Sequence, residues 1–348
     1  MSAPDGAIQS DEALGIDHPH ALALARATEA SARAAAQWLG SGEPIDLSRA
    51  ARIAMKRKLD EAPFAAEIVI GDGPDDTNHT SPLSIGKRIG PSGVAATHEL
   101  ALDPTEGASF LVHGQTNALS VAALAPPDTF LRPGPAFYMA KVATSREVQG
   151  LIDPTAPVSE ILATTARALG KQVKELTVFV LEKSRHRRLI EEIEHAGARV
   201  ALFPAGDVAG ALMAATPDSG IDLMIGTGGS SEGIISAAAI RALDGVFMAR
   251  FDPQLATEHI AVREAGLDTA RWMEADTLAQ STDILIAATG ITTGILLDGI
   301  AQTFQSESAQ TMILSGATGD RCITTTYRPA GTGPEYVDSL EAYADAIE

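Results

Sequence analysis

Short apolar segments alternate with helical stretches along this chain, and this alternation constrains the fold more than any other feature of the sequence. Strands are predicted at residues 67–71, 98–103, 118–126, 177–183, 199–206, 222–229 and 283–290. Helices are predicted at 19–39, 47–59, 158–170, 187–197, 208–216 and 231–245. Strands that alternate with helices indicate an α/β architecture, in which helices cover the faces of sheets. With 348 residues, 45% of them hydrophobic, the chain can bury the core that such a fold requires.

The first predicted helix is flanked by residues that favour helix starts and stops. Asp17 is the predicted N-cap, Pro19 suits the first turn, and Gly40 suits the stop. The alternation is clearer in the second half of the chain, which predicts a division near residues 184–186. The predicted parts are a flexible N-terminus at 1–16, α/β domains at 17–184 and 185–330, and a C-terminal tail at 331–348 that includes the helix-like segment LEAYADAIE.

The composition excludes several classes of protein. A formal charge of −19 argues against non-specific nucleic-acid binding, which depends on clustered lysine and arginine. No apolar run is long enough to span a membrane, and the first residues lack the basic and apolar regions of a secretory signal. The single cysteine, Cys322, excludes a disulfide framework within one chain and favours a reducing, cytoplasmic compartment.

Acidic residues follow three of the predicted strands. They are Asp72 after EIVIG, Asp103 and Glu106 in the segment ALDPTEGAS that ends the strand HELALD, and Glu232 after DLMIGTGG. Ligands of open α/β sheets gather at the carboxyl ends of strands, and carboxylates there suit a hard cation such as Mg²⁺ or Mn²⁺. Such an ion holds phosphate oxygens and lowers the pKa of a bound water. The alternative is that these acids cap helices or form turns, as Asp-Pro and Asp-Gly pairs often do.

The densest basic cluster is Arg185-His186-Arg187-Arg188, just after the strand at 177–183. It is either a clamp for phosphate oxygens or the solvated start of a helix, paired with Glu191 and Glu192. The glycine-rich segment 226–233 turns from strand to helix, where backbone N–H groups favour an anion. It matches neither the dinucleotide fingerprint nor the Gly-Lys-Ser/Thr phosphate-binding loop. The histidines lack the spacing of a zinc hydrolase.

Several longer motifs, taken in order, resemble one family. They are RATEASARAAAQWLGSG, ALDPTEGASFLVHGQTNALSV, LEKSRHRRLI, FPAGDVAGALMAATPDSGIDLMIGTGGSSEGIISAAAIRALDG and AATGITTGILLDGI. Together they are similar to the class II fructose-1,6-bisphosphatases, the GlpX family, which includes enzymes that also cleave sedoheptulose-1,7-bisphosphate. The resemblance covers roughly residues 20–328, and the ordered set of motifs is far more specific than the Asp-Pro-Thr-Glu-Gly segment alone.

The resemblance implies a layered α/β/α/β/α sugar-phosphatase fold that binds Mg²⁺ or Mn²⁺ and hydrolyses a phosphosugar with a metal-activated water. It implies a metal-binding domain before residue 185, a phosphosugar-binding domain after it, and a homodimer or homotetramer. The implied metal ligands are Asp72, Asp103, Glu106 and Glu232, and the implied catalytic residues are Asp103, Glu106, Asp76 and Ser109. The implied substrate-binding residues are Gly107, Ala108, Tyr138, Arg185, His186, Arg187, Gly206, Asp207 and Gly229.

The sequence also departs from the family pattern. Asp72 replaces a ligand glutamate and is one methylene shorter, and Ser48 stands where the family has a metal-ligand aspartate, with Asp46 two residues away. Ala108 replaces a threonine that helps to orient the attacking water, with Ser109 next to it. The family's Asp-Gly-Asp sugar contact begins here with Ala205.

Three hypotheses follow from the motifs and their departures. The first is a divalent-metal-dependent phosphatase that acts on a phosphorylated sugar or sugar bisphosphate. The second keeps the phosphate site but eliminates phosphate from, or isomerises, a phosphosugar or phosphonucleoside, since Ser48 and Ala108 replace groups that serve hydrolysis. The third is a non-catalytic phosphosugar-binding protein. Solvent oxygen in the released phosphate distinguishes hydrolysis from elimination, and ligand-induced stabilisation without turnover distinguishes binding alone.

Overall fold

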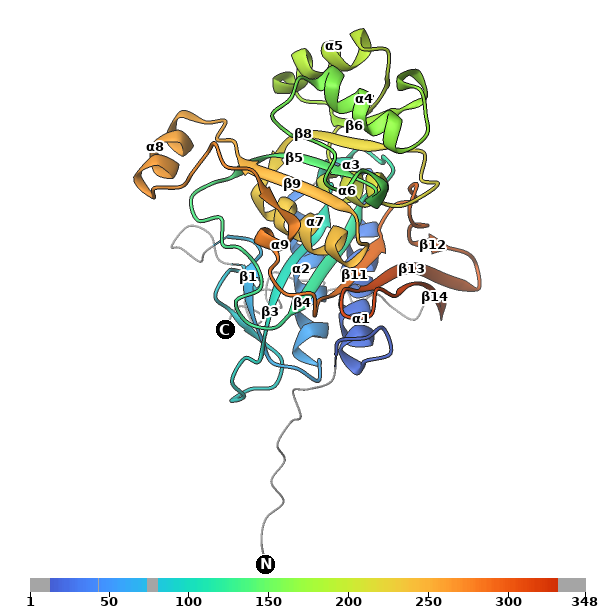
Figure 1. Ribbon diagram of the computed structural model, residues 1–348. Coiled ribbons are helices and arrows are strands. Elements are labelled where there is room, and N and C mark those ends of the chain that lie inside the picture. The colour runs from blue at the N-terminus through green and yellow to red at the C-terminus, as the bar shows by residue number, and fades with distance from the viewer. Residues whose placement is uncertain (1–12, 43, 74–80, 331–348) are drawn as a thin grey trace, which may run out of the picture.

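The computed structural model describes residues 13–42, 44–73 and 81–330. Within these ranges the chain forms two β-sheets and three layers of helices (Figure 1). The predicted terminal helix in LEAYADAIE and the predicted catalytic residue Asp76 lie outside the described residues. Among the described residues, no helix is both long enough and apolar enough to cross a membrane.

The first sheet has eight strands in the order β12-β13-β11-β4-β3-β1-β2, with β14 paired to β13. Their bounds are β1 Ala66–Ile70, β2 Arg88–Ile89, β3 His98–Glu106, β4 Leu119–Ala125, β11 Leu285–Gly290, β12 Ala301–Gln302, β13 Ser306–Ser315 and β14 Arg321–Pro329. The second sheet has the order β10-β9-β5-β8-β6-β7. Its strands are β5 Tyr138–Thr144, β6 Thr177–Leu181, β7 Arg199–Phe203, β8 Leu223–Gly229, β9 Val246–Phe251 and β10 Met273–Glu274.

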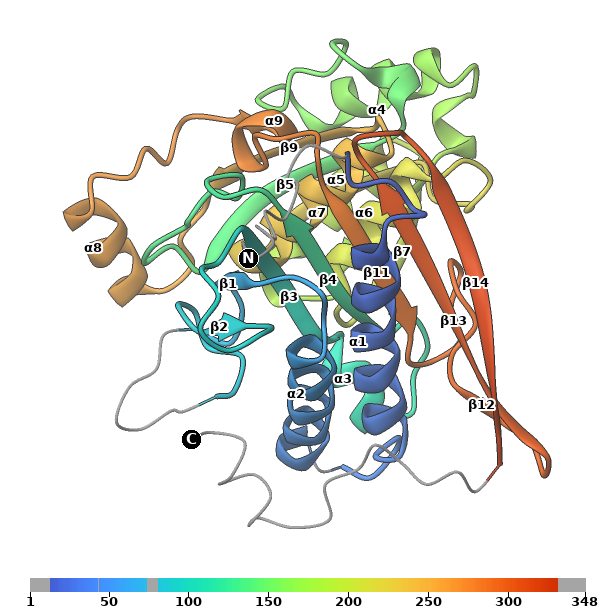
Figure 2. The same ribbon diagram turned by 90° about the horizontal axis from the view of Figure 1, so that it is seen from below.

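Helices pack on both faces of each sheet. Helices α1 (Pro19–Ala36) and α2 (Pro44–Asp60) lie side by side on the outer face of the first sheet (Figure 2). Helices α6 (Asp207–Ala215) and α7 (Ser230–Ala242) lie between the sheets, and α4 (Val158–Ala168) and α5 (Arg187–His195) cover the second sheet. The short helices are α3 (Ala108–Val112), α8 (Ala256–Glu264) and α9 (Ala275–Leu278), with 3₁₀ turns at Arg146–Val148, Val173–Glu175 and Ser184–His186.

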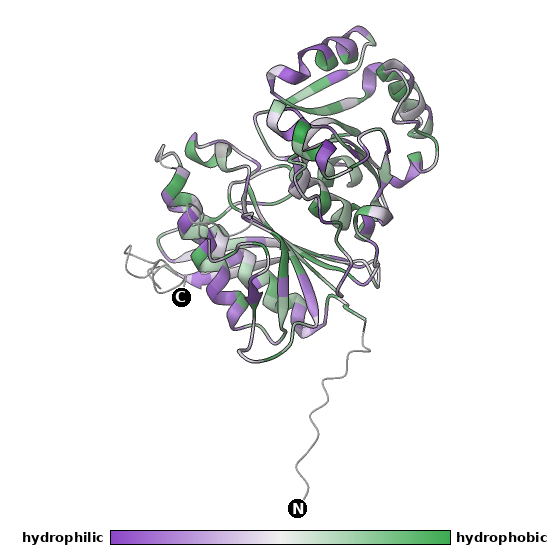
Figure 3. Ribbon diagram, turned by 90° about the vertical axis from the view of Figure 1, so that its left-hand side faces the viewer, coloured by the Kyte–Doolittle hydropathy of each residue, from purple (hydrophilic) through white to green (hydrophobic). Residues whose placement is uncertain are grey.

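The resulting order of layers is α/β/α/β/α, which confirms the predicted fold class. The largest hydrophobic cluster fills the space between the two sheets, where α7 contributes Ile234, Ile235 and a run of alanines, and Ala101 of β3 and Phe247 of β9 face it. Figure 3 shows the outer helices as mixtures of hydrophobic and hydrophilic segments, as expected for helices with one packed face and one solvated face.

The first helix begins and ends differently from the prediction. Its N-cap is His18 rather than Asp17, and His18 Nδ1 accepts a hydrogen bond from the His20 N–H over 3.2 Å. The helix ends at Ala36, and Gly40, with a positive φ of 71°, lies in the turn beyond it. The Gly40 N–H donates to the Leu111 carbonyl, so the chain has already turned toward α3. Pro19 occupies the first turn as predicted.

Each sheet takes strands from both sides of the predicted boundary at 184–186. Strand β5 precedes the boundary and pairs with β8 and β9, which follow it. Strand β11 follows the boundary and pairs with β4, which precedes it. The two-domain division stays a prediction, and any domains defined by it share both sheets.

A bulge in β3 directs two acids toward one cluster. Asp103 is opposite Val121 and Glu106 is opposite Leu119, so three steps along β3 match two along β4. In a regular strand, residues three apart point to opposite faces. The extra residue in the bulge shifts the alternation by one, so that Asp103 and Glu106 point to the same face. Because β1 runs parallel to β3, the end of β1, just before Asp72, approaches the same edge of the sheet.

We expect His20 to make the protein less stable in mild acid. Burial, and then the neighbouring His18 and His98 side chains, lower the pKa of His20 to about 4 from its usual 6.5. A depressed histidine pKa means that the native state favours the neutral ring. The stabilising contribution is therefore complete above pH 6.5 and is lost as the pH falls toward 4. The urea midpoint should fall between pH 7 and pH 5, and less steeply in His20→Asn. Exposed His195 provides the control, since His195→Asn should keep the wild-type slope.

Candidate active site

Four acids from three elements line one cavity of about 280 Å³. Asp103 and Glu106 come from the end of β3, Asp207 from the first turn of α6, and Glu232 from the first turn of α7. The rest of the lining includes six further residues that the sequence analysis singled out, which are Gly107, Ala108, Arg185, Ala205, Gly206 and Gly229. Acids predicted from separate strand ends are therefore brought together by the two sheets and the helices between them.

A second hollow, of about 790 Å³, adjoins the first. Asp103, Gly229 and Glu232 line both, so these residues form the wall between the two spaces. The second hollow adds Asp72 and Tyr138, together with the segment 133–137 and the start of α7. The site is thus elongated, with carboxylates at its centre and a more apolar extension toward exposed Phe137.

Three of the acids are held in surroundings that oppose their charge. Burial, followed by the charge of Glu232, raises the pKa of Asp103 to about 7. Burial, followed by the charges of Asp103 and Asp207, raises the pKa of Glu106 well above its usual value, and burial likewise raises the pKa of Glu232. Crowded buried carboxylates require protons or a cation to balance their charge.

The donor set fits a divalent cation. Glu106 Oε1 accepts a hydrogen bond from the Val208 N–H over 3.2 Å, whereas its buried Oε2 has no hydrogen-bond partner among the described residues. Carboxylate oxygens of this kind are the ligands of hard divalent ions. Within the described ranges, no group of three or more histidine, cysteine, aspartate or glutamate side chains stands close enough together to hold a metal ion without side-chain movement.

Two basic side chains occupy the flanks of the carboxylate cluster. Lys141, from the middle of β5, is fully buried, and its Nζ lies 3.0 Å from Asp207 Oδ2. Arg52 of α2 places its Nε 2.7 Å from Oδ2 of Asp72, which lines the second hollow. Neither was singled out from the sequence. A lysine inside the apolar segment YMAKVAT was the available signal for the first, because buried lysines are rare unless paired.

Glycines before α7 leave room for the acids. A Cβ added at Gly229 would overlap Glu232 Oε2, and one added at Gly228 would overlap the Asp207 carboxylate. The Gly229 N–H also donates to Asp207 Oδ2 over 3.1 Å. The glycine-rich turn therefore positions two carboxylates by allowing close approach.

The basic segment splits into residues with different environments. Arg185 is exposed, donates from Nε and Nη2 to the Thr227 carbonyl over 3.0 and 2.8 Å, and lies 5.0 Å from the centre of the Tyr138 ring. Arg187 is exposed at the start of α5 and lines neither hollow. Arg188 pairs with Glu192 along the helix, which is the solvated arrangement weighed for this cluster. Only Arg185 of these arginines reaches the cavity.

His186 is buried and has both ring nitrogens in hydrogen bonds. Nδ1 contacts the Leu181 carbonyl at 2.7 Å, and Nε2 accepts from the Thr227 N–H at 2.8 Å. This pattern assigns a neutral ring with its proton on Nδ1, and burial lowers the pKa of His186. The ring ties β6 to β8 beneath Arg185, so His186 positions the loop instead of lining the cavity.

Two left-handed glycines precede the helices at the cavity edge. Gly107, with φ 80°, precedes α3, and Gly206, with φ 97°, precedes α6. The Phe110 ring packs against both, so a side chain at either position would be strained and crowded. Ala108 begins α3 at this edge, and nothing is described of the Ser109 side chain.

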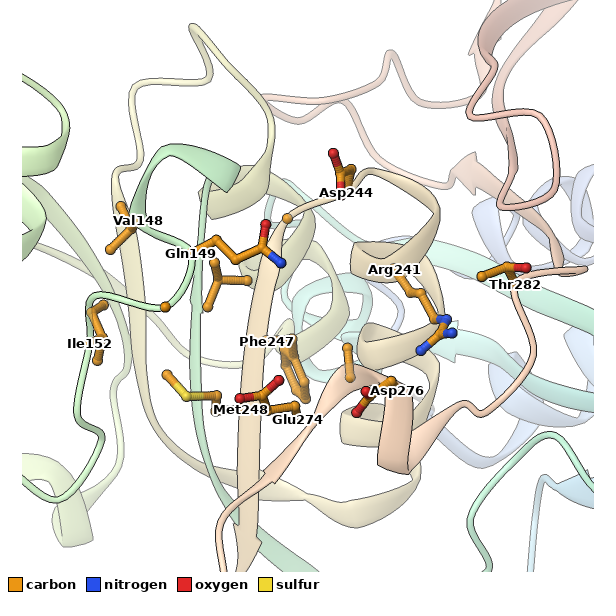
Figure 4. Close-up of a pocket in the computed structure, with 14 residues that line it drawn as sticks. Val148, Gln149, Ile152, Arg241, Asp244, Phe247, Met248, Glu274, Asp276 and Thr282 are labelled. Carbon is orange, nitrogen blue, oxygen red and sulfur yellow. The ribbon is translucent and has the colours of Figure 1, made fainter.

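A separate cavity of about 350 Å³ lies at the far end of α7 (Figure 4). Arg241, Asp276 and Gln149 face it, and none of the acids of the carboxylate cluster lines it. The chemistry predicted from the sequence therefore concentrates in the smaller, carboxylate-lined cavity.

Comparison with known proteins places this architecture in one family. Residues 18–327 match the family described as bacterial fructose-1,6-bisphosphatase, glpX-encoded. The chain is 37% identical over 309 residues to fructose-1,6-bisphosphatase class 2 of Haemophilus influenzae, covering 85% of this chain and 92% of that one. It is 36% identical to fructose-1,6-bisphosphatase 1 class 2 of Escherichia coli, covering 85% and 91%. These matches confirm the resemblance, and the chain belongs to the glpX-encoded fructose-1,6-bisphosphatase family.

Proposed function

We propose that this protein is a divalent-metal-dependent phosphatase that hydrolyses a phosphate ester of a sugar bisphosphate. The observation that carries the proposal is the group of three crowded acids with raised pKa values, Asp103, Glu106 and Glu232, in a cavity that also contains Arg185. Its relatives are named as fructose-1,6-bisphosphatases, which supports the same substrate class.

Asp103, Glu106 and Glu232 are the residues that would hold the cation, and Mg²⁺ or Mn²⁺ is the proposed ion. A bound divalent ion supplies charge to balance the phosphate oxygens and makes water a stronger nucleophile. The protein contributes crowded carboxylates, largely withdrawn from water, that gain stability when a cation binds. Glu106 is fixed on one side by the Val208 N–H and keeps its second oxygen available.

The substrate would lie between the acids and Arg185. Arg185 is held by the Thr227 carbonyl and the Tyr138 ring, so its planar donor group is oriented before a distal phosphate binds. Gly206, Asp207 and Gly229 are proposed to contact the sugar, with Gly107 and Ala108 at the phosphate that is cleaved. His186 acts in this proposal by fixing the loop below Arg185.

The test is phosphate release from sugar mono- and bisphosphates in the presence of Mn²⁺ or Mg²⁺. Fructose-1,6-bisphosphate and sedoheptulose-1,7-bisphosphate should be included, and ¹⁸O-labelled water should place one solvent oxygen in each phosphate. Release that persists in excess chelator would contradict the proposal. Release without solvent oxygen would indicate elimination, and ligand-induced stabilisation with no release would indicate binding alone.

Substituting Gly229 by alanine is expected to lower this activity about 10²-fold, because the new Cβ displaces the Glu232 carboxylate. The backbone at Gly229 has φ −65° and ψ 144°, which alanine adopts without strain, so the fold should persist. Steady-state kinetics and a thermal melt separate the two effects. Gly15→Ala is the matched control, since a Cβ there meets only ordinary contacts. Full activity in Gly229→Ala would show that the present position of the Glu232 carboxylate is not required for phosphate release.

Two further properties are proposed from the family and the edge of the first sheet. We propose a cytoplasmic homodimer or homotetramer. In the described structure β14 pairs only with β13, and it exposes Ile323 and Tyr327 on a strand of nine residues. A long exposed edge strand invites pairing with another chain. Light scattering of the intact protein tests the oligomeric state.

A further inference from the structure

The acids of the site fall into two groups, according to whether a basic side chain of the protein already contacts them. Asp72 is paired with Arg52, and Asp207 is paired with Lys141. For Asp103, Glu106 and Glu232 no ion pair appears among the described residues. The negative charge that an added cation could balance is therefore concentrated on Asp103, Glu106 and Glu232.

The Asp72 carboxylate is held by two contacts on the same oxygen. Its Oδ2 accepts from Arg52 Nε at 2.7 Å and from the Ser81 hydroxyl at 2.5 Å. The Asp72 side chain is 12% exposed and the Arg52 side chain 26% exposed, so the pair is largely shielded from water. A guanidinium keeps its charge at every physiological pH, which makes this a permanent contact between opposite charges.

Arg52 lies on the same face of α2 as Ser48, one helical turn further along. Ser48 stands where the family pattern has an acidic ligand, so this face of the helix has lost an acid and presents a base beside Asp72. The charge of Arg52 also acts on Asp103, which places the guanidinium within electrostatic reach of the central acids.

We propose that Arg52 is a resident cation that takes the place of a second divalent ion at Asp72, so that each chain binds one such ion tightly. This inference rests on the proposed function, because it takes Asp103, Glu106 and Glu232 as the group that binds the ion. Because both contacts fall on Oδ2, an ion could reach Asp72 without displacing Arg52 only through Oδ1, and it would then lie beside the guanidinium charge. Arg52 thereby acts as a positioning residue that withdraws Asp72 from the metal-binding set.

The experiment is calorimetric titration of the chelator-stripped full chain with Mn²⁺ in the absence of substrate. We expect one tight Mn²⁺ per chain in the wild type. Asp72→Asn should keep that stoichiometry and change the affinity by no more than about tenfold, the lower range for a neighbour that is not a ligand. Arg52→Gln should add a second binding event, and adding Asp72→Asn to that variant should remove it.

Two variants on the same helix keep the outcome interpretable. Arg52→Lys retains a positive charge and should stay at one Mn²⁺ per chain. Arg49→Gln removes a neighbouring arginine, which pairs with Asp46, and should also stay at one. If Arg52→Gln fails to fold, the wild type, Asp72→Asn and Arg52→Lys still decide the question, because all three are expected to bind a single ion.

Two results would overturn the inference. One is a wild type that binds two Mn²⁺ tightly and loses one in Asp72→Asn, which would make Asp72 a ligand despite Arg52. The other is a folded Arg52→Gln variant that still binds only one. A wild type that binds no Mn²⁺ at all would instead refute the proposed function, so the two failures are distinguishable.

Discussion

Replacing Asp103 by asparagine is expected to lower metal-dependent phosphate release by a factor on the order of 10⁴, the upper range for one positioned catalytic group. Asp103 lies at the centre of the site, lines both hollows, and is half-buried close to the charges of Glu106 and Glu232. Asparagine keeps the size of the side chain and removes the charge that would hold a cation. Phosphate release with Mn²⁺ measures the effect.

The same substitution should make the metal-free protein more stable. The pKa of Asp103 is raised to about 7 from its usual 3.8, so the native state favours the neutral carboxyl. The stabilising contribution is complete below about pH 3.8 and is lost as the pH rises toward 7. At pH 8 in chelator, Asp103→Asn should therefore melt several degrees above the wild type, and saturating Mn²⁺ should reverse the order.

Measuring phosphate release together with the melting temperature separates a loss of catalytic activity from a loss of folded protein. Asp60→Asn is the matched control, since Asp60 pairs with Lys56 and lines neither part of the carboxylate site. It should leave phosphate release and the chelator melt close to wild type. An Asp103→Asn protein that keeps most of its activity, or that melts lower than the wild type in chelator, would contradict the assignment of Asp103.

The sequence predicts well those elements whose pattern is local. Strands such as β1 and β4 are nearly continuous apolar runs bounded by turn residues, and the structure places them within one or two residues of the prediction. The sequence analysis did not predict β5, β9, β13 and β14, nor the two-residue strands β2, β10 and β12. Lys141 interrupts the apolar run of β5, and β14, at the sheet edge, alternates between exposed and partly exposed residues. Their strand character depends on partners far along the chain, which no local pattern contains.

The site was predictable only in part, for a related reason. Acids at strand ends pointed to Asp103, Glu106 and Glu232, but the same residues could equally have capped helices or formed turns, so the sequence left both explanations open. The contacts that divide the acids into paired and unpaired groups join residues 20 to 66 positions apart, as in Arg52 with Asp72 and Lys141 with Asp207. Such pairings exist only once the sheets and helices are packed together.

The separate roles of the basic segment were likewise invisible in the sequence. Arg185, His186 and Arg187 are consecutive, yet the first lines the cavity, the second is buried with both ring nitrogens bonded, and the third is exposed outside it. A 3₁₀ turn at Ser184–His186 followed directly by α5 sends the three side chains in different directions. A run of basic residues therefore predicts a charged surface, while the turn geometry decides which member reaches a ligand.

Substituting Ala108 by threonine is expected to raise phosphate release about 10²-fold, the lower range for a group that assists proton transfer. Ala108 is the first residue of α3 and lines the cavity with Asp103 and Glu106, so a hydroxyl there adds a polar group next to the acids. Ala108→Val has the same branched shape without the hydroxyl, and it should give no gain. Initial rates at saturating Mn²⁺ compare the two, and equal gains in both variants would attribute the effect to packing.

The corresponding change on α2 should behave differently on its own. Ser48→Asp places a carboxylate one helical turn before Arg52, where opposite charges at this spacing attract. The new acid would share the Arg52 guanidinium with Asp72. When Ser48→Asp is added to Ala108→Thr, phosphate release should therefore rise little above that of Ala108→Thr alone. A large gain should require Ser48→Asp together with Arg52→Gln, since only then does the Asp72 end of the site lose its internal cation. A large gain from Ser48→Asp alone would show that Arg52 leaves this end of the site open to a cation.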